Sequence, residues 1–473
     1  MKTLPSQGKN HTDILEEMRQ YGGQDVNYRQ ARTWSLVYHL DEEHTEFLKQ
    51  AYGLYFSENA LNPMAFQSLK RFETDVINMT AHLLHGDEQA VGTLTSGGTE
   101  SCLLPVLTYR DLAKANRRFP FKPEMIAPES IHVAWSKAAK YFGVKIRYAP
   151  LKQDFRVDIA AVKKMINRRT IMLVGSAPSY PHGVIDPIGE LGLLAQQHKL
   201  PLHVDACLGG FLLPFIEMNG GGVPLFDFRI PGVTSISADV HKYGFAAKGA
   251  STVIYRDMKY MKHQFFIHED WPGGVFASPA LLGTRPGGAF AAAWAAMHAL
   301  GENGYRENAQ KIMDITSKLQ RGINAIDGLQ ILGHPDMSVF AYHSIDDGIN
   351  IFAVGDQMEA RGWQIDRLQR PEGLHVMVVP EHAKITDEYI SDLTASVELV
   401  KSNPKLAAKG NAAMYGMIAN LPFRGMIKKE VMKMMKGMYS SQGQMPMDGS
   451  KNPWLVEKVA GFMQRRKSKK SQG

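Results

Sequence analysis

The sequence predicts an α/β protein whose main domain is a largely parallel sheet with helices on both faces. Two observations support this class. Short apolar runs of strand length alternate with stretches of helical periodicity through much of the chain. Glycine pairs, Gly97-Gly98 and Gly209-Gly210, follow two strand-like runs, as is common where a parallel strand leads into a helix.

The expected elements follow in chain order. The first 58 residues are polar and aromatic, with one helix expected around 41–52. A helix at 98–117 follows the first glycine pair, and a helix at 135–142 precedes a strand at 144–149. The other expected elements are strands at 171–174, 202–204 and 252–255 and a helix at 191–198.

A second, smaller α/β domain is expected after the main one. An alanine- and methionine-rich helix at 289–300 is followed by a glycine-containing break and a helical stretch to about residue 326. Short strands at 339–342 and 376–379 flank a helix at 352–361. We therefore divide the chain into an N-terminal arm (1–58), a large domain (59–309), a small C-terminal α/β domain (310–420) and a helical basic tail (421–473).

Composition is that of a soluble globular protein, with 44% hydrophobic and 21% charged residues. The net charge of +7 is spread along most of the sequence. A phosphorylated substrate or an anionic membrane surface therefore explains it better than nucleic acid, which we do not expect as a partner. The two cysteines, Cys102 and Cys207, imply no disulfide framework. Because no signal peptide or long apolar run is seen, we expect a cytoplasmic location.

The segment Thr93–Ser101, TLTSGGTES, places two glycines between a strand-like entry and a helix. Free N–H groups and the positive end of the helix dipole would face an anion there. The spacing is neither that of a P-loop nor G-x-G-x-x-G. Taken alone, the segment is more often an ordinary helix start, so phosphate binding is one of two hypotheses.

Two further residues follow strand-like runs and make the anion hypothesis more specific. Asp205 ends the run before Gly209-Gly210, where ligands of open α/β sheets bind, and Lys242 follows the run at 234–237. Alone, Asp205 could be a metal ligand, a ribose partner, the partner of a protonated ring nitrogen or a turn residue. Together with the glycine turn, the pair suggests pyridoxal phosphate, which needs a lysine, a carboxylate and a phosphate pocket. No metal site is predicted.

Four longer motifs carry a resemblance to a known family. The segments IHVAWSKAAKYFG, HVDACLGGFLLPF, TSISADVHKYGFAAKG and SPALLGTRPGG resemble the sphingosine-1-phosphate lyases of the group II decarboxylase superfamily. The similarity runs from about Val37 to Tyr439. It implies the fold type I architecture of pyridoxal-phosphate-dependent transferases, with a seven-stranded sheet, and a homodimer whose subunits share the active sites.

The resemblance also implies roles for individual residues. Lys242 would form the Schiff base, and Asp205 would hold the pyridine nitrogen protonated. His132 would stack on the cofactor ring, although a histidine alone is more often structural. The cofactor phosphate would meet Gly98, Thr99 and His241, with Thr284 from the partner chain. The substrate side would be lined by Tyr38, Asn59, Asn62, Tyr180 and Lys248.

The reaction implied is a retro-aldol cleavage that yields a fatty aldehyde and phosphoethanolamine. A base must take the proton of the C3 hydroxyl, and the sequence does not rank Tyr38, Tyr180 and Lys248 for this role. Two alternatives stay open: an amino-acid decarboxylase on the same fold, and a weakly active cofactor-binding homologue. The second is motivated by departures from the family pattern, in which this chain has Asn62 for histidine, Leu36 for glycine and Ala247 for proline.

The tail contains a candidate amphipathic helix at 423–439. Ile427, Val431, Met434 and Met438 fall on one face, and Lys428, Lys429, Lys433 and Lys436 fall on the other. Such a helix could make transient contact with an anionic membrane surface. We favour the alternative that it packs on the body of the protein with its lysines solvated. The basic run at 465–470 is expected to be a solvated end.

Overall fold

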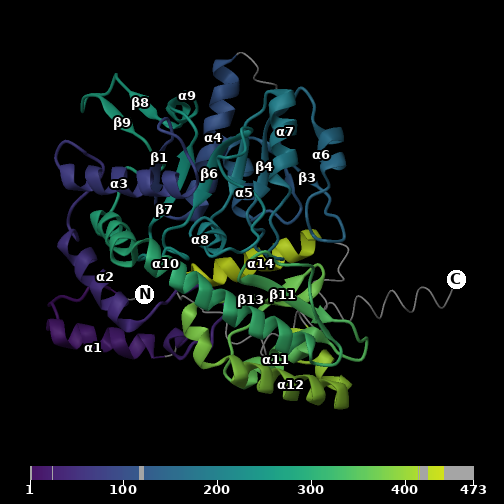
Figure 1. The fold of residues 1–473 in the computed structure, drawn as a ribbon. Coiled ribbons are helices and arrows are strands. Elements are labelled where there is room, and N and C mark those ends of the chain that lie inside the picture. The colour runs from purple at the N-terminus through teal and green to yellow at the C-terminus, as the bar shows by residue number, and fades with distance from the viewer. Residues whose placement is uncertain (1–2, 24, 117–121, 414, 416–423, 441–473) are drawn as a thin grey trace.

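The computed structural model describes residues 3–23, 25–116, 122–413, 415 and 424–440 (Figure 1). Its large domain is built on a seven-stranded sheet of order β1-β7-β6-β5-β4-β2-β3. All neighbours from β6 to β3 pair in parallel, and only β7 runs antiparallel to its neighbours. The predicted mainly parallel sheet is therefore confirmed. The strands are β1 (Val91–Thr95), β2 (Glu124–Pro128), β3 (Lys145–Ala149), β4 (Thr170–Ser176), β5 (Leu202–Asp205), β6 (Val233–Ala238) and β7 (Ser251–Tyr255).

The central strands are buried on both faces, which explains why they appear in the sequence as continuous apolar runs. Successive side chains point to opposite faces and feed two separate cores. On β4, Leu173 packs in the core that contains Leu191, whereas Met172 packs in the core that contains Trp135. The covering helices are α3 (Gln67–Leu83), α4 (Gly98–Ala115), α5 (Ala134–Phe142), α6 (Ile159–Met165), α7 (Ile188–His198), α8 (Leu213–Met218) and α9 (Met258–Met261).

A four-stranded antiparallel sheet of order β10-β11-β13-β12 forms the core of the small domain. Helices α11 (Ile351–Ala360) and α12 (Thr386–Ser402) pack together on it (Figure 1). The long helix α10 (Gly287–Asn324) kinks at Gly301 and contacts both domains. The predicted domain boundary at 309/310 falls inside this helix. The strands are β10 (Leu329–Ile331), β11 (Val339–Ser344), β12 (Asp366–Gln369) and β13 (Glu372–Met377).

The N-terminal arm lies along both domains. The predicted helix is found as α2 (Glu42–Leu54), and α1 (His11–Gly22) is an additional helix that the sequence pattern did not reveal. Between them the backbone joins the small domain, where Met377 N donates to the Trp34 carbonyl and Gln364 N donates to the Arg32 carbonyl. The arm therefore carries the chain from the small domain to α2, which packs against α10.

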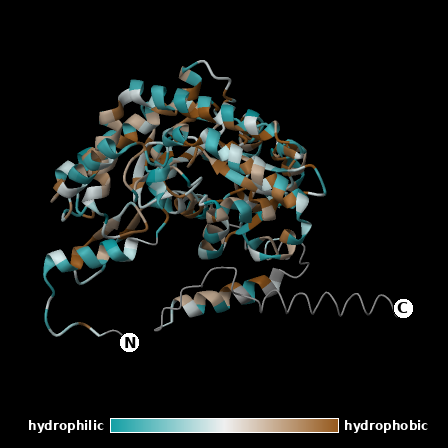
Figure 2. Ribbon diagram, turned by 90° about the horizontal axis from the view of Figure 1, so that it is seen from below, coloured by the Kyte–Doolittle hydropathy of each residue, from teal (hydrophilic) through white to brown (hydrophobic). Residues whose placement is uncertain are grey.

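Three peripheral features complete the described chain. A hairpin of β8 (Phe266–His268) and β9 (Phe276–Ser278) projects from the large domain (Figure 1). Helix α14 (Arg424–Met438) mixes apolar and polar positions along its length (Figure 2). Among the helices of the described residues, none combines the length and apolarity needed to cross a bilayer. The short 3-10 helices are η1 (Tyr28–Gln30), η2 (Lys262–Gln264), η3 (Pro380–Lys384) and η4 (Pro404–Ala408).

The prediction that α14 packs its apolar face on the body is wrong for part of that face. Val431 and Met434 are 48% and 46% exposed in the single chain, while Ile427 and Met438 are half-buried. Lys428, Lys429, Lys433 and Lys436 are all exposed, as expected. The basic run at 465–470 lies outside the described residues.

Candidate active site

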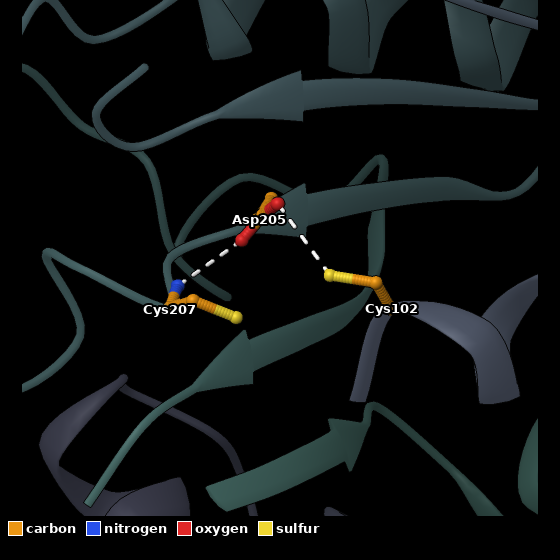
Figure 3. Close-up of side chains that lie close together, drawn as sticks. All are labelled: Cys102, Asp205 and Cys207. Atoms are coloured by element: carbon orange, nitrogen blue, oxygen red, sulfur yellow. Dashed lines mark hydrogen bonds between the residues drawn. The ribbon is translucent and has the colours of Figure 1, made fainter. Parts of the chain in front are cut away.

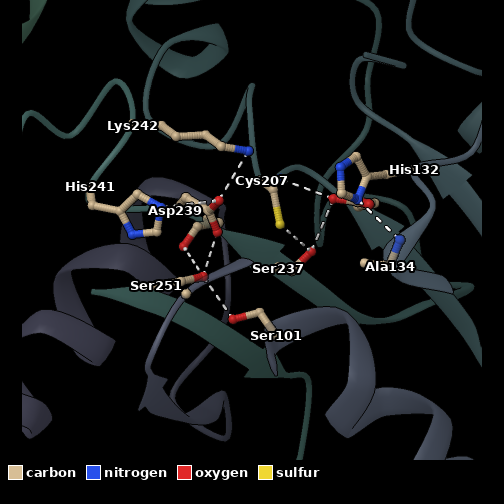
Figure 4. A network of polar contacts seen from close by, with 12 residues as sticks. Ser101, His132, Ala134, Cys207, Ser237, Asp239, His241, Lys242 and Ser251 are labelled. Atoms are coloured by element: carbon tan, nitrogen blue, oxygen red, sulfur yellow. Dashed lines mark hydrogen bonds and ion pairs between the residues drawn. The ribbon is translucent and has the colours of Figure 1, made fainter. Parts of the chain in front are cut away.

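Lys242 lies in the turn that follows β6, beside the carboxyl ends of the parallel strands. Its Nζ atom is 3.0 Å from Oδ2 of the buried Asp239. Asp239 Oδ1 accepts a hydrogen bond from the Ser251 hydroxyl, which is 2.7 Å from the hydroxyl of Ser101 on α4 (Figure 4). Burial opposes the charge of the Lys242 ammonium, but Asp239 raises its pKa well above the ordinary value. Three elements thus hold a charged amine at the strand ends.

Asp205 ends the neighbouring strand β5 and is a buried carboxylate with four donors. Its Oδ2 accepts from Trp135 Nε1 at 2.8 Å and from Cys102 Sγ at 3.6 Å. Its Oδ1 accepts from Cys207 N at 3.2 Å and from Ser237 Oγ at 3.3 Å. Burial disfavours the carboxylate, but the Trp135 hydrogen bond and His132 lower its pKa below the usual range. Asp205 is therefore held ionised.

The Cys102 thiol and the Cys207 backbone N–H both donate hydrogen bonds to Asp205 (Figure 3). The ligand atoms of Cys102, Asp205 and Cys207 lie within 4.8 Å of one another. The Cys102 thiol has a pKa of about 11, because burial and the nearby carboxylates outweigh a hydrogen bond from Cys207 that would lower it. The protonated Cys102 thiol can therefore donate to the Asp205 carboxylate.

The glycine turn lies directly against Asp239 and His241. A side-chain carbon at Gly98 would fall 2.5 Å from Asp239 Oδ2, and one at Gly97 would fall 3.6 Å from His241 Cε1. Gly97 has a φ of 149°, which favours glycine. His241 Nδ1 donates to the Ala250 carbonyl at 2.7 Å, and burial lowers the pKa of the ring, so Nε2 is free of a proton at neutral pH. Glycine is therefore required at position 98 by the close approach of Asp239 and favoured at position 97 by its backbone conformation.

The glycine turn opens α4, an 18-residue helix that begins at Gly98 with Thr99 exposed in its first turn. Glu100 braces the turn, because its carboxylate accepts from Ser96 N at 2.7 Å and from Leu281 N at 2.9 Å. N–H groups at a helix start bind phosphate well. With a charged amine and an ionised carboxylate on adjacent strand ends, these groups fit pyridoxal phosphate.

Tyr180 lies on the loop after β4 and is fixed by the small domain. Its hydroxyl donates to Asp366 Oδ2 at 3.2 Å, and its ring stacks on His375 with centroids 4.3 Å apart. His375 Nε2 also donates to the Tyr180 carbonyl at 2.7 Å. Burial and the Asp366 carboxylate raise the Tyr180 pKa. On its open side, the ring centroid lies 6.5 Å from that of the exposed His132.

Tyr38 and Lys248 form the other wall of the site. The Tyr38 ring packs edge-on against Tyr243, and Lys248 Nζ lies 5.0 Å from the Tyr38 ring centroid. The Tyr38 hydroxyl donates only to Met377 Sδ, at 3.4 Å, and burial raises its pKa. Burial, reinforced by the Lys242 ammonium, lowers the pKa of Lys248 to about 8.

Most of the predicted residues lie together near the carboxyl ends of the parallel strands. Three of them, Asn59, Asn62 and Thr284, form a second group. Asn59 Nδ2 donates to Thr284 Oγ1 at 3.3 Å, and Asn59 Oδ1 accepts from Arg285 N at 3.1 Å. Asn62 Oδ1 accepts from the backbone of Met64 at 3.0 Å, which stabilises the turn before α3. The hydrogen bonds of this group thus stay within the segments 59–66 and 284–286. Thr284 is exposed in the single chain.

Sequence reasoning missed three residues of the site: Asp239, Trp135 and Asp366. Asp239 lies three positions before Lys242, a spacing at which side chains meet when the chain turns, so a signal existed. Trp135 and Asp366 reach the site from distant segments, and their partners could not be inferred from spacing.

The fold and the site together define a pyridoxal-phosphate-dependent enzyme of the decarboxylase type. Residues 55–343 match the family described as pyridoxal-dependent decarboxylase conserved domain. The glutamate decarboxylase of Lactobacillus brevis shares the fold, with a TM-score of 0.74 and 22% identity over 85% of this chain and 95% of that one.

Two closer matches narrow the class. The rice sphingosine-1-phosphate lyase is 44% identical over 91% of this chain and 81% of its own length. The structure of the sphingosine-1-phosphate lyase of Burkholderia pseudomallei matches with a TM-score of 0.85 and 37% identity, over 93% of this chain and 98% of that one. The chain belongs to the sphingosine-1-phosphate lyase family.

Proposed function

We propose that this protein cleaves phosphorylated long-chain bases, sphingosine-1-phosphate among them, to a fatty aldehyde and phosphoethanolamine. The observation that carries the proposal is that Asp205, at the end of β5, and Lys242, in the turn after the adjacent strand β6, lie at neighbouring strand ends, with Tyr38, Tyr180 and Lys248 near Lys242. The family relationship supports the choice of substrate.

The residues of the chain divide the work by chemistry. Pyridoxal phosphate, when bound, supplies a ring that accepts electrons from the bond to be broken. Lys242 provides the amine that would hold it, and Asp205 would keep a proton on the ring nitrogen. The Gly97-Gly98 turn and His241 would hold its phosphate. Lys248, still largely an ammonium below pH 8, offers a cation to the substrate phosphate.

The test is cleavage of sphingosine-1-phosphate by the purified protein with added pyridoxal phosphate. We expect fatty aldehyde and phosphoethanolamine in equal amounts, and Lys242→Ala should abolish both. Lys259→Ala, which changes an exposed lysine paired with Asp257, is the matched control and should retain full activity. Release of carbon dioxide from amino acids, with no aldehyde from the lipid, would instead favour the decarboxylase alternative.

We propose that the active sites are completed by a second copy of the chain, with Thr284 serving the partner's site. Thr284 is exposed and oriented by Asn59, and the nearby hairpin exposes Phe266, Ile267 and Trp271. Light scattering should give a dimer mass. Mixing Lys242→Ala with Thr284→Glu subunits should restore activity, because one site of each mixed dimer is then free of both changes. No recovery in verified mixed dimers contradicts the sharing.

We also propose that α14 makes transient contact with anionic membranes. Its partly exposed Val431 and Met434 and its exposed Lys428, Lys429 and Lys436 match an anionic lipid surface in chemistry. We expect salt-sensitive cosedimentation with vesicles that contain phosphatidylserine and little with pure phosphatidylcholine. The variant Lys428→Glu/Lys429→Glu should lose the difference between the two lipids; equal binding by this variant and the wild type contradicts the contact.

The proposed location is the cytoplasm. Cys102 and Cys207 are both free and buried beside Asp205, where reduced thiols serve as donors. Cell fractionation should place the protein with cytosolic markers, and recovery with an oxidising compartment would contradict this.

A further inference from the structure

Asp366 stands apart from the residues already assigned, because it approaches the site from the small domain. It lies on β12 directly opposite His375 on β13. One strand pair thus presents two groups to Tyr180: a carboxylate 3.2 Å from its hydroxyl and an imidazole stacked on its ring. His375 also anchors the Tyr180 carbonyl. Both the position of the ring and the direction of its O–H bond are therefore determined by the small domain.

The three candidate bases, Tyr38, Lys248 and Tyr180, differ in the group to which each donates its hydrogen bond. The Tyr38 hydroxyl donates to Met377 Sδ, which cannot take up a proton. Lys248 Nζ donates to the His241 carbonyl and lies over the Tyr38 ring, and below pH 8 it is largely an ammonium, which has no lone pair to accept a proton. Tyr180 alone has its phenolic proton directed at a carboxylate. Because that proton points to Asp366, the lone pairs of the Tyr180 oxygen are left for a substrate hydroxyl.

We propose that Asp366 is a positioning residue that makes Tyr180 the proton acceptor for the C3 hydroxyl of the substrate. This inference rests on the proposed function. Tyr180 Oη takes the hydroxyl proton while its own proton moves to Asp366 Oδ2. The electron pair of the hydroxyl O–H bond becomes the second C–O bond of the aldehyde, and the C2–C3 pair stays with C2. C2 then takes one proton from Tyr180, which regains its own proton from Asp366. The proton removed from the substrate hydroxyl is thus returned, and the cycle is balanced.

A first experiment tests the contact without substrate. The protein is labelled with 13Cζ-tyrosine, and Tyr180→Phe identifies the Tyr180 resonance. The titratable groups near Tyr180 include Asp366, His375, His132, Lys242 and Tyr38. His375 is neutral at the pH where tyrosines titrate, because burial lowers its pKa to about 4. Since the Asp366 carboxylate raises the Tyr180 pKa, Asp366→Asn should make the resonance titrate at lower pH than in the wild type. The control is Asp356→Asn. It breaks the ion pair between Asp356 on α11 and Arg367, the neighbour of Asp366 on β12, and should leave the Tyr180 titration unchanged.

A second experiment measures the role in the reaction. Asp366→Asn keeps the shape of the side chain but cannot accept a proton, so kcat should fall by roughly 10²- to 10⁴-fold with KM little changed. The absorbance of bound pyridoxal phosphate should match the wild type. Tyr180→Phe should cost a similar factor, and the double variant should lose no more than either single variant. Asp366→Glu should recover part of the rate, and Asp356→Asn should be fully active although less stable.

The outcomes separate this inference from the proposed function. If the wild type cleaves no phosphorylated long-chain base, the proposed function fails, and the tyrosine titration still decides whether Asp366 controls Tyr180. An unchanged titration in Asp366→Asn overturns the inference whatever the activity. So does an Asp366→Asn enzyme with full kcat, or a double variant whose losses multiply.

Discussion

At the scale of single residues, the site depends on two buried aspartates in different surroundings. Asp239 faces the Lys242 ammonium and is 1% exposed on its side chain. Asp205 instead accepts hydrogen bonds from uncharged donors of Trp135, Cys102, Cys207 and Ser237. The first carboxylate therefore keeps a lysine charged, while the second keeps its own charge available for a protonated ring. Environment rather than residue type assigns the roles.

Trp135→Phe should weaken cofactor binding, because it removes the shortest hydrogen bond to the Asp205 carboxylate without changing the core greatly. Loss of one donor to a buried charge costs about 1–3 kcal/mol, so the dissociation constant of pyridoxal phosphate should rise roughly 5- to 150-fold. Titration followed by absorbance measures it. Trp294→Phe, which removes an indole bond to Asp75 on another helix, should leave the affinity unchanged. Equal affinities for Trp135→Phe and the wild type would contradict this role.

Leu36 occupies a left-handed backbone conformation, with a φ of 69°, and its side chain is 73% exposed. The conformation explains why a glycine at this position would be natural, since leucine there is strained by about 1–2 kcal/mol. Leu36→Gly relieves that strain but adds about 0.5–1 kcal/mol of chain entropy to the unfolded state, so stability should stay near that of the wild type or rise slightly. Leu36→Val should lower the free energy of unfolding by about 1 kcal/mol, because β-branched residues tolerate this region poorly. Urea unfolding measures the series, and a valine variant as stable as the wild type would refute the strain.

At the scale of elements, α10 links the two domains through one irregular residue. Gly301 has φ 57° and ψ −178°, a combination that is essentially restricted to glycine. Helix α10 as a whole packs against α2 and α3 and also against β10 and α12 of the small domain. Just after the kink, Tyr305 stacks on Phe215 and donates to the Gly244 carbonyl, both in the large domain. The break therefore sets the direction in which the chain enters the small domain.

Substituting the two glycines near this break should have opposite effects. Gly301→Ala meets no atom within 4 Å, so its cost of about 1–3 kcal/mol is backbone strain alone. Gly304→Ala lies in regular helix, with neighbours no closer than 3.4 Å, and should stabilise by up to about 1 kcal/mol. Free energies of unfolding in urea give both values. The kink would not need glycine if both variants were equally stable.

At the scale of the whole molecule, the site lies where all three parts of the chain meet. Tyr38 comes from the arm, Tyr243 from the large domain and Met377 from the small domain. The Tyr243 hydroxyl donates to the Val378 carbonyl at 3.1 Å and accepts from Ser338 Oγ at 2.8 Å. Closing the small domain on the large one therefore also assembles the wall formed by Tyr38.

Acid should destabilise this assembly, and His382 is one cause. Its Nδ1 accepts from Val379 N and its Nε2 donates to the Thr33 carbonyl, so the folded protein holds it neutral and burial lowers its pKa to about 4. Between about pH 6.5 and 4 the unfolded chain binds a proton at His382 that the folded chain does not. The free energy of unfolding therefore decreases as the pH is lowered, and His382 accounts for a loss of roughly 3 kcal/mol at pH 4. Urea unfolding at several pH values should show a shallower fall for His382→Gln. The same slope as the wild type would exclude His382 as a contributor.

Much of the fold was open to sequence reasoning, because its signals are local. The helix after Gly97-Gly98 was expected at 98–117 and is found at Gly98–Ala115, and the strand expected at 144–149 is β3. The alternation of apolar runs predicted the parallel sheet. The helix α1 was missed because its residues are all exposed or nearly so, leaving no apolar face to detect. The exposure of Val431 and Met434 was missed because periodicity shows that a helix has an apolar face but not whether that face is covered.

The sequence by itself determined the fold class and the placement of Lys242, Asp205 and the glycine turn at strand ends, because strand length, helical period and turn chemistry depend on neighbouring residues. The tertiary structure alone decided which groups face them. Asp366 lies 186 positions from Tyr180, and Asp205 lies 70 positions from Trp135. Such partners are chosen by how sheets and domains pack, and the energy that selects the packing is spread over the whole core rather than encoded in any local spacing.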